Sequence, residues 1–320
     1  MDTRVALHDA SQTLERPPWR ALAAVPGRSF DDEEAVNIHP SANRRLKDFE
    51  TALGLTALPP RGPLFAGVDL GTAYIVTSVV DAAGMPVAGA LTRSRASIRD
   101  GLVLDYIGAI NLLRAQVETI RRAGYAIGDA MVCYPPGTAG RNARAFANVL
   151  EAADLHVTGL LDEPSAAAEV LEITDGAVVD IGGGTTGISV LKDGEVVYTA
   201  DEATGGTHLD LVLAGNFKIS VEEAERIKTD TSRQREIFPL VRPVFQKMAA
   251  IVRQHLRDHP VQTLYLVGGT SAFPGAVEVM EEETGLEVAL PSHPLLVTPL
   301  GIGMRCAREA RANAKSGKGK

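Results

Sequence analysis

Two glycine-rich turns, each led by an aspartate, carry the residue types of this chain that are best suited to binding a phosphate. The first is Gly67–Thr72, with the sequence GVDLGT, and the second is Asp180–Thr186, with the sequence DIGGGTT. Glycine lets backbone N–H groups face an anion with no Cβ in the way, and the neighbouring threonine hydroxyls add donors. An aspartate repels a bound polyphosphate unless a cation lies between them, so Asp69 and Asp180 imply Mg²⁺.

The same arrangement of strands surrounds both turns. Apolar, β-rich runs predict strands at 64–70 and 74–80 around the first turn, and a similar run at 188–191 follows the second. The run at 74–80 ends at the turn Asp81–Gly84, and the run at 188–191 ends at the turn Lys192–Gly194. Strand, glycine turn and strand therefore occur twice, which predicts a phosphate clamp built by two related domains.

Two other nucleotide-binding motifs are excluded. Residues 182–187 satisfy the dinucleotide pattern G-x-G-x-x-G, which requires a helix to begin there. Here the chain continues as a strand through Ile188–Leu191, so we reject a nicotinamide or flavin site. The sequence G-x-x-x-x-G-K-[ST] does not occur, so the chain is not a P-loop NTPase.

Strands and helices alternate along the rest of the chain, as in an α/β domain. A further strand is expected at 129–134, and Glu163-Pro164 places a proline at the first position of a helix. A capping box at Ser220 begins the helix that carries Glu225 and Lys228 on one face. Apolar residues at helical spacing predict longer helices at about 106–123, 140–153, 239–257 and 298–312.

The order of these motifs resembles the actin-like ATPase superfamily, which includes DnaK-type chaperones, the filament protein MreB and sugar kinases. Within it the chain looks most like the EutJ family, chaperone-like proteins encoded with bacterial ethanolamine-utilisation enzymes, through the stretches 179–189 and 201–208. The resemblance implies an α/β, actin-like ATPase (ribonuclease H-like) fold, with duplicated domains around a nucleotide cleft and minimal insertions. The five segments that carry it are, in order, Gly67–Thr72, Leu161–Ala168, Asp180–Thr186, Ala224–Lys228 and Leu266–Thr270.

The resemblance also sets the expected domain boundaries. Residues 64–174 would form the first actin-like domain and 175–297 the second, followed by a helix at 298–312 that returns to the first domain. Residues 1–63 are rich in charge and proline and are expected to be a partly disordered N-terminal extension. The lysine-rich residues 313–320 are expected to be a disordered tail.

One part of the N-terminal extension has a helical pattern, with Leu46, Phe49 and Leu53 on one face. One interpretation is a docking segment, in which these apolar residues anchor a helix in a groove of a partner protein or in a compartment lumen. The other interpretation is a partly ordered extension with no partner. The sequence leaves both open.

The resemblance assigns roles to residues of the cleft, with ATP or ADP and Mg²⁺ as the ligands. Asp69 and Asp180 would hold Mg²⁺, and Glu163 would position or activate the attacking water with help from Asp180. Glu225 and Lys228 would contact the ribose and adenine; without the family context they would be an ordinary exposed ion pair. The other residues expected at the nucleotide are Gly71, Thr72, Ala73, Gly182, Gly183, Gly184, Thr185, Thr186, Gly205, Gly206, Gly268, Gly269 and Thr270.

The chain departs from the DnaK pattern at several positions. DnaK-type chaperones carry an acidic residue where this chain has Gly187, and an arginine that stacks on adenine where it has Ala272. Their Gly-Thr-Thr is Gly71-Thr72-Ala73 here, and their phosphate-contacting lysine has no counterpart. These differences are compatible with nucleotide binding but argue against fast hydrolysis. We expect a weak Mg²⁺-dependent ATPase, or a pseudo-ATPase that binds ATP without turnover.

The composition bounds the class of protein. The 320 residues suffice for two domains, and 45% hydrophobic with 22% charged residues is typical of a soluble globular protein. A formal net charge of −8 argues against nucleic-acid binding, and no apolar run or signal core indicates a membrane span or secretion. Two cysteines fit a reducing cytoplasm, and we expect Cys133 to be a small buried apolar residue rather than a nucleophile.

Four functions remain open at this point. The first is a nucleotide-switched assembly or reactivation factor whose partners, implied by the resemblance alone, are ethanolamine-utilisation enzymes or microcompartment proteins. The second is an MreB-like scaffold, which the small insertions disfavour. The third is a small-molecule kinase, which the small insertions disfavour because they leave few residues to form the wall of a substrate pocket. The fourth is a pseudo-ATPase that acts as a nucleotide-gated binding module.

Overall fold

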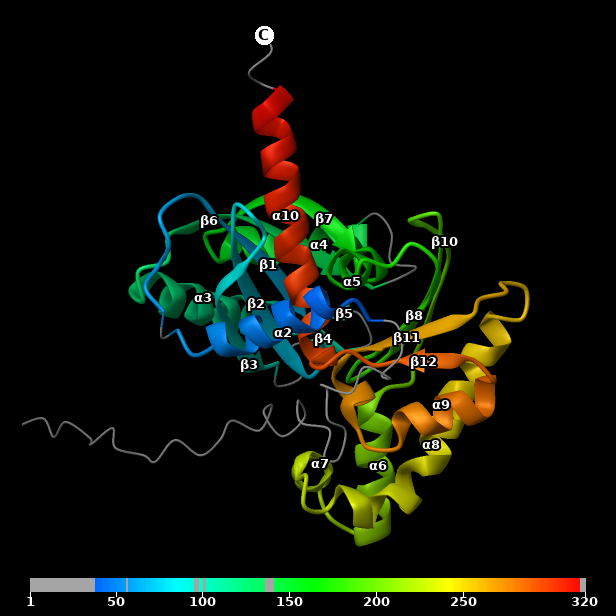
Figure 1. Ribbon diagram of the computed structural model, residues 1–320. Coiled ribbons are helices and arrows are strands. Elements are labelled where there is room, and N and C mark those ends of the chain that lie inside the picture. The colour runs from blue at the N-terminus through cyan, green and yellow to red at the C-terminus, as the bar shows by residue number, and fades with distance from the viewer. Residues whose placement is uncertain (1–37, 56, 95–97, 100–101, 136–140, 317–320) are drawn as a thin grey trace, which may run out of the picture.

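The computed structural model shows two five-stranded sheets with the same strand order (Figure 1). The first lobe, residues 64–162, contains the sheet β3-β2-β1-β6-β7, and the second lobe, residues 176–289, contains the sheet β10-β9-β8-β11-β12. In both, three antiparallel strands are followed by two parallel ones. The structure describes residues 38–55, 57–94, 98–99, 102–135 and 141–316.

The first lobe has helices on both faces of its sheet. Helices α3 (Tyr106–Arg122) and α4 (Arg141–Ala152) bury Leu113 and Leu150 against one face. Helices α5 (Glu163–Leu171) and α10 (Val297–Ser316) cover the other face. The strands are β1 (Leu64–Leu70), β2 (Tyr74–Asp81), β3 (Pro86–Arg93), β6 (Ile127–Tyr134) and β7 (His156–Asp162), beside a short ribbon of β4 (Ile98–Arg99) and β5 (Leu102–Val103).

The second lobe repeats this plan with different helices. Its apolar core gathers around Phe245 and Met248 of helix α8 (Gln234–His255), which pack against the sheet. Its strands are β8 (Gly176–Ile181), β9 (Thr186–Lys192), β10 (Glu195–Glu202), β11 (Thr263–Val267) and β12 (Glu287–Ala289). Its helices are α6 (Gly206–Phe217), α7 (Val221–Thr229), α8 (Gln234–His255), α9 (Ala276–Thr284) and the short 3₁₀ turns η1 (Gly269–Ala272) and η2 (Pro294–Leu296).

Helices α5 and α10 lie between the two sheets and cross each other closely. Val178 and Leu191 of the second sheet share one apolar cluster with residues of the first sheet and of these helices. The crossing needs a glycine, because a Cβ at Gly301 of α10 would overlap the backbone oxygen of Ala166 on α5. A Cβ at Gly67 of β1 would likewise overlap the backbone of Gly303. Small residues therefore bring these helices against the sheet and against each other.

Both glycine turns join antiparallel strands, as the sequence predicted. Asp69 of β1 lies opposite Val76 of β2, and Asp180 of β8 lies opposite Gly187 of β9. Residues 186–192 form a strand rather than a helix, so the G-x-G-x-x-G match is not a dinucleotide site. The duplicated α/β architecture predicted from these hairpins is confirmed.

Three expectations about helices need correction. Leu46 and Phe49 of α2 (Pro40–Ala52) are fully buried in the core beside α10, so they are not free to anchor a partner. Helix α10 extends to Ser316, so residues 313–316 are helical rather than part of a disordered tail. Helix α8 begins at Gln234, ahead of Pro239, because Gln234 and Ile237 are buried and their packing outweighs the local cost of the proline.

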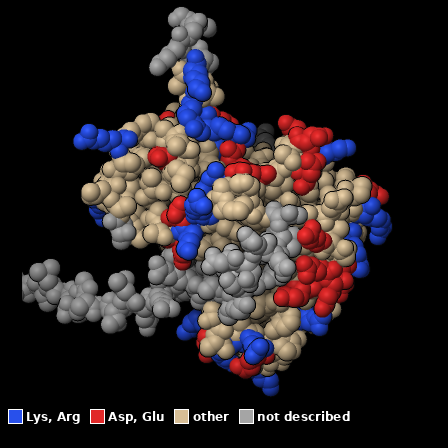
Figure 2. Space-filling view, in the orientation of Figure 1, with Lys and Arg blue, Asp and Glu red and all other residues tan. Residues whose placement is uncertain are grey.

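Charge is spread unevenly over the face seen in Figure 2. Acidic side chains gather over α9, which carries Glu278, Glu281, Glu282 and Glu283, and basic side chains follow the projecting end of α10. Arg308 and Arg305 of α10 both pair with Glu169 of α5, at 2.9 and 3.7 Å. Within the described residues, no helix is long and apolar enough to cross a membrane. Residues 1–37 and 317–320 lie outside the described part of the chain.

Candidate functional site

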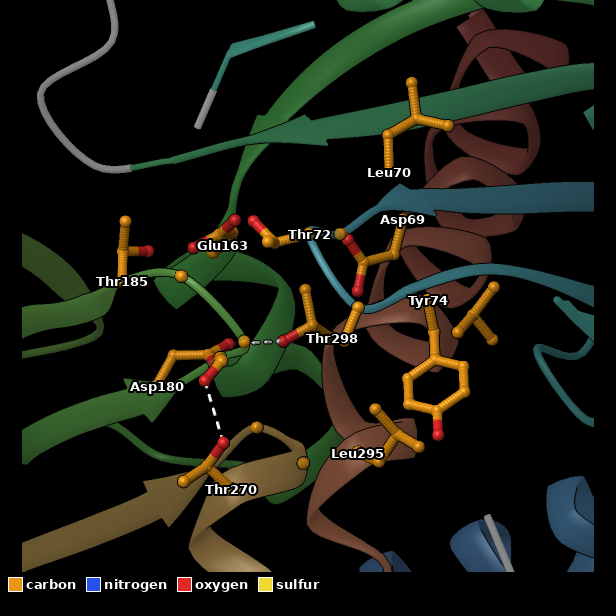
Figure 3. Close-up of a pocket in the computed structure, with 18 of the residues that line it drawn as sticks. Asp69, Leu70, Thr72, Tyr74, Glu163, Asp180, Thr185, Thr270, Leu295 and Thr298 are labelled. Carbon is orange, nitrogen blue, oxygen red and sulfur yellow. Dashed lines mark hydrogen bonds between the residues drawn. The ribbon is translucent and has the colours of Figure 1, made fainter. Parts of the chain in front are cut away.

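A cleft lies between the two lobes and brings the two glycine turns together (Figure 3). Its walls come from the β1–β2 turn, the β8–β9 turn, the start of α5, helix α7, and the turns η1 and η2. Its volume is about 1100 Å³ when counted to its open mouth. The cleft is concave and combines apolar side chains with a few convergent polar groups, as small-molecule sites do.

The two glycine turns have the same local geometry and face each other. The Gly71 N–H donates to the Tyr74 carbonyl at 3.0 Å, and the Gly182 N–H donates to the Thr185 carbonyl, also at 3.0 Å. A Cβ at Gly183 would lie 3.0 Å from the Cβ of Ala73, so the turns nearly touch across the cleft. Backbone N–H groups and threonine hydroxyls of both turns therefore border one narrow space.

Of the residues expected at the phosphates, the β8–β9 turn places Gly182, Gly183, Gly184 and Thr185 on the cleft wall, but not Thr186. Thr186 is buried, and its hydroxyl donates to the Thr204 carbonyl at 2.6 Å. The structure thus removes Thr186 from the candidate phosphate ligands. The β1–β2 turn contributes Gly71, Thr72 and Ala73, all on the wall.

Gly205 and Gly206 also do not line the cleft; they support the β8–β9 turn from behind. The Gly206 N–H donates to the Gly182 carbonyl at 3.0 Å, and the next N–H, of Thr207, donates to the Gly183 carbonyl at 2.8 Å. A Cβ at Gly205 would lie 2.7 Å from the Gly184 carbonyl carbon, so only glycine fits there. These residues support the turn and do not form the cleft wall.

Three carboxylates, Asp69, Glu163 and Asp180, surround one space beside the turns (Figure 3). Burial, and then the charge of Asp180, raises the pKa of Asp69 to about 7. Burial also raises the pKa of Asp180 to about 6, although a hydrogen bond from the Thr298 hydroxyl, at 3.1 Å, opposes the shift. Carboxylates held together in this way repel one another unless a cation joins them.

The donor set fits Mg²⁺ only when a ligand completes it. Within the described residues, no three His, Cys, Asp or Glu side chains are arranged to hold a metal by themselves. Mg²⁺ is commonly held by one or two carboxylates together with water and phosphate oxygens. Asp69 and Asp180 fit that pattern, because each presents a carboxylate to the cleft whose ionisation is disfavoured by burial and then by nearby negative charge, which a cation would offset.

Glu163 lies where β7 ends and α5 begins, with Asp162 as the N-cap. The Asp162 carboxylate accepts hydrogen bonds from the Ser165 backbone N–H at 3.0 Å and its hydroxyl at 2.9 Å. Pro164 is therefore the second helical residue rather than the first, in a turn where a missing N–H costs nothing. Burial, and then Asp180, Asp69 and other carboxylates, raises the pKa of Glu163 well above its usual range.

The sequence did not predict the influence of Asp201 on this site or the hydrogen bond that Cys133 makes in it. Asp201 of β10 lies opposite Gly187 in the strand pairing, and its negative charge raises the pKa of both Glu163 and Asp180. Cys133 is buried as expected, but its thiol also donates to Asp69 Oδ1 at 3.6 Å, and burial raises its pKa well above the usual range.

Glu225 and Lys228 both line the cleft, but they do not pair with each other. Glu225 Oε2 accepts from Arg93 Nη1 at 2.9 Å, a residue of the opposite lobe. Lys228 Nζ donates to Asp210 Oδ2 at 2.7 Å and to the Gly206 carbonyl at 3.1 Å. The alternative interpretation, an ordinary exposed i,i+3 ion pair, is therefore wrong. Asp210 is so buried that its pKa rises to about 6 despite the lysine.

Gly268 lies at the base of the cleft, at the end next to α7, in a position with no space for a side chain. Gly268 has a positive φ of 86°, and a Cβ there would overlap Asp180 Oδ1. Gly269 and Thr270 also line the cleft, and the Thr270 hydroxyl donates to the Gly182 carbonyl at 2.8 Å. Ala272 is buried and off the wall. The wall residues that the sequence did not predict include Tyr74, Val76, Pro135, Leu209, Thr229, Phe273, Leu295 and Thr298.

Comparison with known sequences identifies the family. The ethanolamine utilization protein EutJ of Escherichia coli K12 is 44% identical over 260 residues, which are 81% of this chain and 91% of that protein. The chain belongs to the EutJ family. The EutJ protein of Salmonella typhimurium LT2 is 45% identical over 255 residues, 79% of this chain and 88% of its own length.

Solved structures agree with this assignment. The crystal structure of EutJ from Carboxydothermus hydrogenoformans superposes with a TM-score of 0.78 at 48% identity and covers 82% of this chain and 98% of that one. MreB5 of Spiroplasma citri, solved bound to ADP, has a TM-score of 0.65 at 17% identity over 80% of this chain and 99% of its own, which shows the fold alone. A family profile for the type IV pilus assembly protein PilM matches residues 164–298. This EutJ-family chain thus has the actin-like ATPase fold.

Proposed function

We propose that this EutJ-family protein binds ATP together with Mg²⁺ in the interdomain cleft and uses the bound nucleotide as a conformational switch. The observation that supports it most strongly is the pair of facing glycine turns beside Asp69, Glu163 and Asp180. The turns supply N–H and hydroxyl donors for phosphates, and the carboxylates supply the ligands for a cation. Because the two turns belong to different lobes, a ligand that contacts both would hold the lobes together.

The proposed chemistry divides between the carboxylates. A bound Mg²⁺ would neutralise phosphate charge, with Asp69 and Asp180 holding it. Glu163, at the first turn of α5, would orient a water molecule toward the terminal phosphate. Burial raises the pKa of Glu163 well above its usual range, and the positive charge of a bound cation would favour its ionised form.

A pseudo-ATPase is the second candidate, and one observation favours it. Lys228 is the one Lys or Arg on the described cleft wall, and its ammonium is engaged by Asp210 and the Gly206 carbonyl. Phosphoryl transfer depends on positive charge that stabilises the transition state. With no other cationic side chain on that wall, we expect hydrolysis to be slow, or absent with binding retained.

The proposed role follows from the family. Relatives named for ethanolamine utilization support a role in assembling or reactivating enzymes of that system, or in organising a microcompartment, in the cytoplasm. Nucleotide binding would open and close the lobes and thereby present or withdraw a surface to such a partner. An MreB-like scaffold is a further alternative, which nucleotide-dependent light scattering by the purified protein would reveal.

Steady-state phosphate release from Mg-ATP distinguishes the switch from the pseudo-ATPase. The purified full chain is compared with Glu163→Gln and with Glu118→Gln, which removes an exposed carboxylate on α3. Slow turnover that falls at least about tenfold in Glu163→Gln alone supports a hydrolytic switch with Glu163 placing the water. No turnover in any of the three, with ATP still raising the melting temperature, supports the pseudo-ATPase. No turnover and no thermal shift contradict both.

A further inference from the structure

Helix α2 belongs to the first lobe by its apolar contacts. Ala42, Leu46 and Phe49 are completely buried, in a cluster that includes strands β1 and β2 and helix α10. The fit against β3 is tight, because a Cβ at Gly89 would lie 2.7 Å from Phe49 Cε2. This apolar face holds α2 on the first lobe without any help from its polar residues.

The polar side of α2 reaches the segment that follows β12. Asn43 Oδ1 accepts from the Ser292 backbone N–H at 2.9 Å, and Glu50 Oε2 lies 3.1 Å from His293 Nε2. Burial lowers the pKa of His293, so its imidazole is neutral at physiological pH. The bonding pattern assigns the proton to Nε2, which donates to Glu50, while Nδ1 accepts from the Ser292 hydroxyl at 2.9 Å.

The segment held by α2 continues directly into the cleft wall. The Pro294 carbonyl accepts from the Gly268 N–H at 3.0 Å, which fixes the glycine at the base of the cleft. Leu295 lines the cleft and packs against Gly269, where a Cβ would lie 3.1 Å from Leu295 Cδ1. Residues 292–296 therefore connect α2 to the wall formed by Gly268, Gly269 and Leu295.

Helix α2 also contacts the helix that begins with Glu163. Glu172, at the C-terminal end of α5, accepts from Arg45 Nη1 at 2.7 Å and from the Ser41 hydroxyl at 3.2 Å. Glu172 has a left-handed backbone with φ of 57°, and the hydrogen bond from Arg45 lowers its pKa. One helix thus contacts both the segment that holds Gly268 and the element that carries the proposed water-positioning carboxylate.

We propose that α2 is a strap that positions the Gly268–Leu295 wall of the cleft, with Asn43 and Glu50 as the positioning residues. They act through residues 292–296 and do not touch the ligand. The inference rests on the proposed function, since it concerns the affinity of the same cleft for a nucleotide. It assigns α2, residues 40–52, a part in ligand binding instead of a separate docking role.

The experiment separates positioning from mere stabilisation. The full chain is prepared as wild type, Glu50→Ala, Asn43→Ala, the double variant Asn43→Ala/Glu50→Ala, and Glu50→Gln, which keeps an acceptor for His293. Asp48→Ala is the matched control, because Asp48 is an exposed acid on the same helix. Mg-ATP affinity is measured by calorimetric titration, and amide hydrogen exchange is followed at residues 264–272 and 292–296.

We expect the double variant to bind Mg-ATP about tenfold more weakly, the effect of losing about two partly buried hydrogen bonds. Its amides at 266–270 and 292–296 should exchange faster while those of β1 and α8 stay unchanged. Glu50→Gln should retain most of the affinity, and Asp48→Ala should match the wild type. Affinity that follows this order would not result from a uniform loss of stability.

Two other results overturn the proposal, and they are distinguishable. If the wild type binds Mg-ATP and the double variant binds it equally well, with only a lower melting temperature, α2 is structural and the proposed function stands. If the wild type binds no nucleotide at millimolar concentration, the proposed function fails and the role of α2 in nucleotide affinity fails with it.

Discussion

Arg93 at the end of β3 and Glu225 on α7 form an ion pair that crosses the cleft from one lobe to the other, with Nη1 and Oε2 2.9 Å apart. Tyr74 lies beside this pair, and although its burial is the main cause of its raised pKa, the charge of Arg93 opposes that shift. The pair lies next to Lys228 on the cleft wall, so it connects the two lobes beside the space proposed for the nucleoside.

Removing this cross-cleft pair should speed nucleotide release. The side chains of Arg93 and Glu225 are 37% and 28% exposed, so solvent screens their attraction. A pair of this kind contributes about 0.5–1 kcal/mol, which corresponds to an about two- to fivefold faster dissociation of a fluorescent ATP analogue from Arg93→Ala. Arg122→Ala is the control, since it breaks an exposed pair within α3 alone. Equal dissociation rates for wild type, Arg93→Ala and Arg122→Ala would show that the Arg93–Glu225 pair does not slow nucleotide release.

The carboxylate cluster should make stability and Mg²⁺ binding depend on pH in opposite directions. The pKa of Asp69 is raised from 3.8 to about 7, so the folded state favours the protonated form. Its stabilising effect is complete below about pH 4 and is lost as the pH rises through about 7. Mg²⁺ needs the ionised carboxylate, so its affinity should increase over the same range.

Thermal unfolding tests this pH dependence. The melting temperature of wild type without added metal should fall more between pH 5 and pH 8 than that of Asp69→Asn. The rise in melting temperature on adding Mg-ATP should be larger at pH 8 than at pH 5 in wild type and small at both in Asp69→Asn. Asp48→Asn, on the exposed side of α2, should behave as wild type. Parallel curves for wild type and Asp69→Asn would contradict the assignment.

Two helical glycines should respond to alanine in opposite ways. Gly301 faces the backbone of α5 with no space for a Cβ, so Gly301→Ala should destabilise the protein by about 1–3 kcal/mol and displace Glu163. Gly215 of α6 has open space around it, so Gly215→Ala should be neutral or stabilise by up to about 1 kcal/mol. Urea unfolding measures both. Equal effects would show that the α5–α10 crossing tolerates a side chain.

Lys228 and Asp210 should be energetically coupled. Their side chains are 14% and 7% exposed, and Asp210 Oδ1 has no hydrogen-bond partner among the described residues. Lys228→Met leaves a buried carboxylate without its cation and should cost about 3 kcal/mol in urea unfolding. The double variant Lys228→Met/Asp210→Asn should recover at least half of that loss. Additive losses would mean that the two side chains contribute to stability independently of each other.

The sequence predicted the parts of the fold that depend on local pattern. The glycine turns and the apolar runs beside them predicted both hairpins, with Asp69 and Asp180 at their strand ends. The Glu163-Pro164 pair predicted the start of a helix at Glu163. It did not predict partners that are distant in the chain. Glu225 and Lys228 share a helix face, yet each bonds to a residue on another element. The sequence predicted that the Thr186 hydroxyl faces a phosphate, whereas in the fold this hydroxyl donates a hydrogen bond to the Thr204 carbonyl.

The N-terminal region shows the same limit. The spacing of Leu46 and Phe49 predicted a helix with one apolar face, and α2 confirms it. The pattern does not say whether such a face packs inside the same chain or against another protein. The outcome depends on β3, where Gly89 leaves room for Phe49.

The proposed nucleotide site is tested by calorimetric titration of Mg-ATP into the purified chain, beside Gly183→Val and Gly128→Val. Valine at Gly183 would fill the space between the two turns, where a Cβ would lie 3.0 Å from that of Ala73, whereas Gly128 has nothing within 4 Å. We predict saturable Mg²⁺-dependent binding to the wild type and to Gly128→Val, and loss of binding in Gly183→Val. Equal binding to all three would place the nucleotide elsewhere, and no binding to the wild type would contradict the claim outright.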